Sequence, residues 1–155
     1  MALQQGRDFV LADNITYVGT AGMGKGCLVG THDRILVVPI EVTRVKGYIR
    51  YRSETTTLTL KGKNPAEMIR NFAAEDGVRL SDLSGLMDEI VAQVEGAVLH
   101  ELSAIRRLKV KNSFFSRGIY LNKNDSNVGW TGYPLKKQDA VAFEEFYRGH
   151  PAAQQ

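Results

Sequence analysis

The sequence predicts an α+β fold with an antiparallel sheet, and three observations lead to this class. Residues 14–60 are rich in Val, Ile, Thr and Tyr with glycines between them, which is typical of short strands. Residues 64–103 change to steps of three and four between apolar positions, which is typical of helices. Strand-like runs return after residue 105. Strands and helices are therefore segregated, which favours antiparallel pairing.

The chain of 155 residues suits one domain, residues 1–155, because domains commonly contain about 100–200 residues. Apolar residues make up 43% of the chain, enough for a core. The single cysteine, Cys27, excludes an intramolecular disulfide and a multi-cysteine zinc site. There is no run of about 18 apolar residues, and the N-terminus is polar, so we expect no transmembrane segment and a cytoplasmic location.

The first half is expected to form hairpins. Thr31 to Arg34 has the composition of a tight turn. Pro39 falls late in a strand-like run, which indicates an edge or a bulge. The expected strands are Thr16–Val18, Gly26–Thr31, Arg34–Glu41, Arg44–Arg52 and Thr55–Lys61.

Two helices are expected next, as an insertion over residues 64–103 between the early and late strands. Asn64, Pro65 and Glu67 form a helix-start signature, and Gly77 can end that helix in a left-handed conformation. A longer helix is expected from near Ser81, with one apolar face. The apolar positions on that face are Leu83, Leu86, Met87, Ile90, Val94, Ala97, Val98 and Leu102.

The last third is expected to contain short strands and one amphipathic helix. That helix spans roughly Lys136–Arg148, because Gly149 is a natural C-cap and Pro151 prevents continuation. A polar turn is expected at residues 122–127. The strands expected here are Arg106–Val110, Gly118–Leu121 and Val128–Tyr133.

The run from Ile105 to Leu121, with the polar turn, short strand and helix Gln138–Tyr147 that follow, resembles the end of bacterial pleckstrin-homology-like (PH-like) domains. The hairpins around Gly26–Val38 are similar to the opening strands of that family. The resemblance implies a strongly bent, barrel-like antiparallel sheet with the C-terminal helix plugging one end. It also implies a binding or scaffolding module rather than an enzyme. The helical insertion at residues 64–103 departs from the family pattern.

Gly19, Gly24 and Lys25 match the spacing of a phosphate-binding loop, G-x4-G-K. Such a loop cradles phosphates with backbone N–H groups and a lysine. However, Gly26 stands where a magnesium-binding Ser or Thr is needed, and the next residues favour a strand rather than a helix. A nucleotide-binding protein is therefore the alternative hypothesis, and a glycine-rich hairpin is the favoured interpretation.

Basic residues occupy alternate positions in two strand-like runs. Residues two apart in a strand share one face, so these cations would line one surface. On one sheet they would bind an anionic partner such as a lipid head group, a nucleic acid or an acidic protein. An ordinary solvated sheet face is the other interpretation. The candidate anion-binding residues are Arg44, Lys46, Arg50, Arg52, Lys109, Lys111 and Arg117.

The net charge of +3 hides an uneven distribution. Residues 64–104 carry two basic and eight acidic side chains, a net −6, whereas residues 105–137 carry eight and one, a net +7. Helices 64–103 can cover the sheet or pair with another subunit, so a homo-oligomer is one expectation. No catalytic constellation, metal site or cofactor motif stands out. We expect a non-enzymatic binding module with a protein or an anionic ligand as partner.

Overall fold

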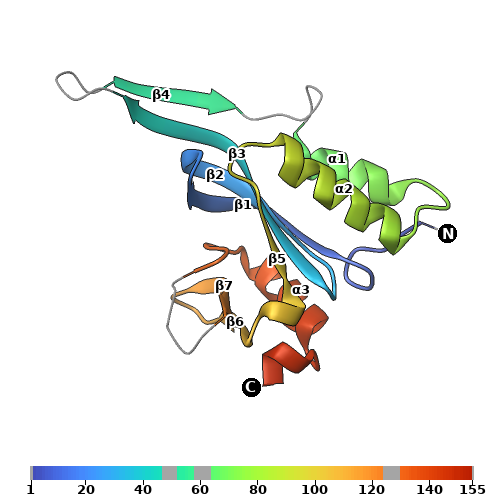
Figure 1. Ribbon diagram of the computed structural model, residues 1–155. Coiled ribbons are helices and arrows are strands. Elements are labelled where there is room, and N and C mark those ends of the chain that lie inside the picture. Colours follow the sequence, from blue (N-terminus) through green and yellow to red (C-terminus); the bar gives the residue numbers. More distant parts are fainter. Residues whose placement is uncertain (1, 47–51, 58–63, 124–129, 155) are drawn as a thin grey trace.

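The computed structural model describes residues 2–46, 52–57, 64–123 and 130–154, and it has an antiparallel sheet of five strands at its centre (Figure 1). Strands β1 to β4 follow one another in order, and β5 pairs with β3. Both β4 and β5 lie along the edge of β3 that faces away from β2, beside different halves of it. The bounds are β1 Val10–Gly19, β2 Gly22–Gly30, β3 Arg34–Lys46, β4 Arg52–Thr57 and β5 Val98–Glu101.

The two faces of this sheet are covered by different elements (Figure 1). Alternate residues of a strand point to opposite faces. Leu36 and Val38 of β3 contact the helical pair, whereas Ile35 and Val37 contact the C-terminal elements. The covering elements are α1 Pro65–Ala74 and α2 Leu80–Gln93 on one face, and β6 Arg107–Asn112, β7 Arg117–Asn122 and α3 Lys137–Tyr147 on the other. Two short 3₁₀ helices, Leu102–Ala104 and Pro151–Gln154, complete the described elements.

The α+β class and the antiparallel pairing are confirmed. The five-stranded sheet is not closed into a barrel, and β6 and β7 form a separate two-stranded sheet. The barrel implied by the PH-like resemblance is therefore not confirmed. Within the described residues, no helix is both long and apolar enough to cross a membrane.

The expected irregularity at Pro39 is confirmed. Pro39 lies opposite Gly26, and the β2–β3 register shifts between Lys25 and Gly26. On the other edge of β3, β5 pairs with β3 as far as Val37, and pairing with β4 starts at Glu41 of β3, so Pro39 falls in the gap between the two partners. A proline that lacks an N–H is tolerated where no ladder bond is required.

Several expected boundaries are wrong. The first strand begins at Val10 rather than Thr16, because a bulge places the exposed Asp13 and Asn14 within it. The expected strands Arg34–Glu41 and Arg44–Arg52 are not separate: β3 continues to Lys46, and Arg52 already belongs to β4.

The second helix ends at Gln93 rather than near Leu102. Gly96 has a φ of 82°, a left-handed conformation that turns the chain, and residues 98–101 then pair with β3 as β5. The first helix also ends early, at Ala74, with Gly77 (φ 81°) in the turn that follows it. Of the expected strand Val128–Tyr133, residues 128 and 129 lie outside the described residues, and Gly132 forms a bridge to Ile119.

Candidate binding groove between β6 and α3

Strand β6 has one edge paired and one edge open. Its residues Leu108 and Val110 turn toward the core, and Leu108 is buried, while Arg107, Lys109 and Lys111 are exposed. β6 pairs with β7 alone among the described strands. Its second edge lies beside α3, and this edge is where the strand can meet another molecule.

The hydrogen-bond pattern shows which backbone groups of β6 point to the open edge. Ser113 N donates to Ser116 O at 3.0 Å, and in β7 the N–H and C=O of Ile119 both bond toward Gly132, away from β6. Paired residues in an antiparallel ladder alternate between bonded and non-bonded. With Val110 opposite Ile119 in the register, Leu108 and Val110 direct their N–H and C=O groups away from β7. Within the described residues, no hydrogen bond outside the β6–β7 ladder involves these groups.

A groove of about 510 Å³ follows this open edge. Strand β6 forms one wall, and the C-terminal end of α3 with the following turn forms the other. Its volume falls within the range of about 300–1,000 Å³ that is usual for binding sites. The lining residues are Arg107, Leu108, Lys109, Val110, Glu144, Tyr147, Arg148, Gly149 and Ala153.

Tyr147 fixes the α3 wall. Its ring is buried, and its hydroxyl donates to Thr31 O at 2.8 Å, in the turn between β2 and β3. Burial raises the pKa of this hydroxyl far above its ordinary value, so it remains a donor. This bond joins the last turn of α3 to a part of the chain 116 residues away.

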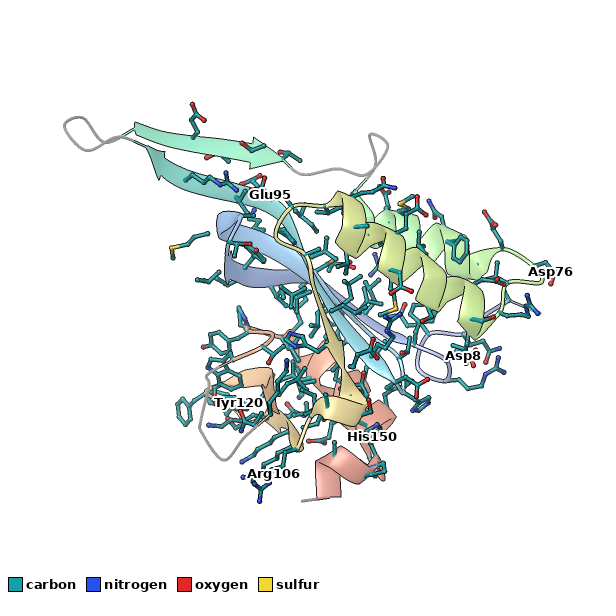
Figure 2. All side chains as sticks on the ribbon, viewed as in Figure 1. Asp8, Asp76, Glu95, Arg106, Tyr120 and His150 are labelled. Carbon is teal, nitrogen blue, oxygen red and sulfur yellow. The ribbon has the colours of Figure 1, made fainter. Side chains whose placement is uncertain are left out.

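A second set of contacts holds the chain just beyond α3. His32 stacks on Phe146 with ring centroids 4.2 Å apart, and a ring nitrogen of His150 lies 2.9 Å from His32 O. His150 is labelled in Figure 2, beside the C-terminal end of the molecule. Gly149, with a φ of 84°, lets the chain leave the helix and bring Ala153 back against β6. Tertiary contacts of α3 and of the segment after it therefore hold this wall of the groove in place.

The groove is electropositive. Arg107, Lys109 and Arg148 supply three cations at its lining, against the single carboxylate of Glu144. In the described part of the chain, none of the three cations forms an ion pair with a carboxylate. Leu108, Val110 and the Tyr147 ring give the groove an apolar floor. The arrangement can hold an extended, negatively charged chain by backbone bonds, charge and apolar contact together.

The structure separates the basic residues that the sequence analysis placed on one face. Lys109 and Lys111 are exposed on β6, and Arg117 on β7 donates from Nε to Asn112 Oδ1 at 3.2 Å. Arg44 has a structural role instead: its guanidinium donates to Ala21 O at 2.5 Å and pairs with Glu95.

The other residues of that proposed patch lie elsewhere. Lys46 ends β3 and pairs in register with Arg52 of β4, so Arg44 and Arg52 do not share one strand. Arg50 lies outside the described residues. The β3–β4 pair projects from the opposite end of the molecule from β6 and β7 (Figure 1), so the two basic strand pairs are not neighbours and do not form one patch.

The glycine-rich segment is a hairpin. Gly19 ends β1 opposite Gly22, which begins β2, and Gly24 and Lys25 are paired with β1 on one side and β3 on the other. A Cβ atom on Gly24 would lie 1.9 Å from Glu41 O, so close strand packing accounts for this glycine. The segment does not lead into a helix, and its strand residues bond to neighbouring strands, which disfavours a phosphate-binding loop.

Of the polar groove residues, the sequence alone singles out Lys109 and does not single out Arg107, Glu144, Tyr147 and Arg148. Arg107 shares the alternation of Lys109 and Lys111, so the periodicity of the strand was a usable signal. The helix residues carry no such signal, because only the tertiary fold brings them to β6. Cys27, the lone thiol, is buried, and burial raises its pKa to about 12, which leaves it protonated.

Comparison with known proteins adds no further information, because no family model, curated protein or solved structure matches the chain.

Proposed function

We propose that this protein is a non-enzymatic binding module that recognises an extended acidic peptide segment in the groove between β6 and α3. The observation that carries the proposal is the open edge of β6 inside an electropositive groove. The backbone N–H and C=O groups of Leu108 and Val110 point into it, and Lys109 and Arg148 stand beside them. This function agrees with the binding role that the PH-like resemblance implies. The PH-like resemblance itself stays a proposal, and so does the cytoplasmic location.

Strand addition explains how such a groove binds. An extended segment placed along an open sheet edge gains main-chain hydrogen bonds, while alternate side chains enter neighbouring pockets. Each residue of an extended chain advances about 3.3 Å, the same as a residue of β6, so about six residues would cover the six-residue β6. Alternate acidic side chains would then reach Arg107, Lys109 and Arg148.

Charge also selects the class of partner. Three cations and one carboxylate around the groove favour an acidic segment over a basic one. A single-stranded nucleic acid would need open aromatic faces for stacking. The groove does not offer them, because Tyr147 is the one aromatic residue among the described residues that line it, and its ring is buried.

The proposal is tested by fluorescence anisotropy with a labelled peptide of alternating Glu and Val residues. Two peptide controls are required: the same peptide with Lys in place of Glu, and one N-methylated at alternate positions to remove backbone donors. We expect binding of the first peptide only, and weaker binding as salt rises. Equal binding of the N-methylated peptide would contradict strand addition.

Protein variants then locate the site. Lys109→Glu should weaken binding roughly tenfold, since it replaces an attraction by a repulsion at the groove rim. Lys25→Glu is the matched control, because it makes the same charge change on an exposed residue of β2 outside the groove. Equal losses in both variants, or tighter binding of an oligothymidylate than of the peptide, would refute the proposal.

A further inference from the structure

The tip of the β6–β7 hairpin exposes two phenylalanines to solvent. Phe114 is 84% exposed and Phe115 is 90% exposed, the highest values among the exposed large hydrophobic residues of the described chain. Their rings touch edge to face, with centroids 5.2 Å apart. Exposed aromatic pairs of this kind mark interaction surfaces rather than ordinary surface positions.

The tip is also held in shape. Ser113 N donates to Ser116 O, and the Ser113 hydroxyl donates to the same oxygen at 2.9 Å. Ser116 N donates back to Ser113 Oγ at 3.2 Å. These bonds fix the turn before any partner arrives, so little conformational entropy remains to be lost on docking. Lys111 and Arg117 follow directly behind the tip, which makes it a convex apolar knob on a basic stem.

A hollow of complementary character lies between the end of α1 and the start of α2. Its volume is about 530 Å³. Apolar side chains of Phe72, Val78 and Leu86 line it together with the carboxylates of Asp76, Asp82 and Glu89. Arg79 pairs with Asp82 at the start of α2, with 3.6 Å between Nε and Oδ2.

The knob and the hollow cannot meet within one molecule. Figure 2 places Asp76, on the rim of the hollow, and Tyr120, on β7, at opposite sides of the molecule. The knob carries part of the most basic stretch of the sequence, and the hollow lies within the most acidic one, with net charges of +7 and −6. Polarity and charge thus match between two different surfaces of the same chain.

We propose that the Phe114–Phe115 tip of one copy docks into the α1–α2 hollow of a second copy. The contact is heterologous, with each copy using its knob on one neighbour and its hollow on another, so it adds copies head to tail. Association grows with protein concentration. It weakens with salt, because the basic stem faces an acidic rim across a solvated boundary. The contact uses the hairpin tip and the helical pair, and it does not depend on the groove beside α3.

Two variants interrupt the two halves of this contact separately. Phe114→Ser with Phe115→Ser removes the knob, and both side chains are exposed, so the fold is not at risk. Gly85→Lys fills and recharges the hollow: a Cβ on Gly85 meets no atom within 4 Å, and lysine is a better helix former than glycine. Each phenylalanine replaced should weaken association by about tenfold.

Sedimentation velocity measures the oligomeric state of the unmodified protein and of each variant. We expect concentration-dependent association of the unmodified protein, and monomers for each variant alone. A mixture of the two variants should form dimers and nothing larger, because one variant supplies only a hollow and the other only a knob. A matched control, Val18→Ser with Met23→Ser, removes two exposed apolar side chains from the β1–β2 hairpin and should associate like the unmodified protein.

Three results would overturn the proposal. The first is an unmodified protein that is monomeric throughout the micromolar to millimolar range. The second is a mixture of the two variants that stays monomeric. The third is a control variant that loses association as fully as the knob variant. Flotation with phosphatidylserine vesicles is run in parallel. A monomer that binds these vesicles through Phe114 and Phe115 would assign the knob to an anionic membrane instead.

Discussion

Replacing Tyr147 with Phe removes one hydroxyl and leaves the ring that lines the groove. That hydroxyl donates to Thr31 O at 2.8 Å and joins α3 to the turn between β2 and β3. Thr31 is 7% exposed, so its carbonyl has no easy access to water once the donor is gone. The variant therefore breaks the tie that positions one wall of the proposed binding site.

The loss of stability expected for Tyr147→Phe has two contributions. A hydrogen bond between neutral groups contributes about 1 kcal/mol net, and a buried acceptor left without a partner adds about 1 kcal/mol or more. We expect the free energy of unfolding to fall by about 2 kcal/mol. For a chain of 155 residues, each kcal/mol moves the Tm by about 2–4 °C, so the Tm should fall by about 4–8 °C.

Urea unfolding and differential scanning calorimetry measure this loss. The control is Tyr133→Phe, since the Tyr133 ring stacks on Trp130 while its hydroxyl makes no hydrogen bond in the described part of the chain. That variant should change the free energy of unfolding by less than about 0.5 kcal/mol. Equal effects of the two substitutions, or no effect of Tyr147→Phe, would refute the reasoning about α3.

Three further predictions concern other parts of the fold. Gly24→Ala should lower the free energy of unfolding, measured in urea, by about 3 kcal/mol, because the new Cβ would strike Glu41 O. Lys25→Ala should leave the free energy of unfolding nearly unchanged. A larger loss of stability in Lys25→Ala than in Gly24→Ala would contradict the packing explanation for this glycine. Arg34→Met should lower the free energy of unfolding by about 2 kcal/mol, because the Arg34 guanidinium donates to Ser84 and Asp88 of α2 and to Glu101 of β5. An unchanged midpoint of urea unfolding would contradict this. Burial lowers the pKa of His100 below its ordinary value of 6.5, so unfolding takes up a proton at acidic pH. The free energy of unfolding should therefore fall as the pH drops through 6.5 and below, as urea unfolding at several pH values measures. A His100→Gln variant with the same pH dependence would exclude His100 as the cause.

Local signals in the sequence were enough for the start of α1 and for the presence, though not the bounds, of most strands. The Asn64 side chain accepts from Ala66 N at 2.9 Å and Pro65 is the first helical residue, as the start signature predicts. The end of α2 could not be predicted in this way. Val98 continues the helical spacing of apolar residues, yet it pairs with β3 across about sixty residues, and a periodicity read within one segment contains no information about that partner.

The candidate site, too, could be predicted from the sequence only in part. The alternation of cations in β6 was visible in the sequence, and the structure confirms that Lys109 and Lys111 are exposed on one strand. Their separation from Arg44 was not visible, because strand order is a tertiary property. The second wall of the groove likewise depends on where α3 docks, which is determined by contacts such as that of Tyr147 with Thr31.

The central claim is that an acidic peptide adds as a strand to the open edge of β6. Amide hydrogen exchange, followed by NMR with and without the Glu–Val peptide, tests it residue by residue. Strand addition should newly protect the Leu108 and Val110 amides, whose N–H groups face the groove, and should change little at Arg107 and Lys109, which bond to β7. A bound peptide that leaves the Leu108 and Val110 amides exchanging as fast as before would contradict the account.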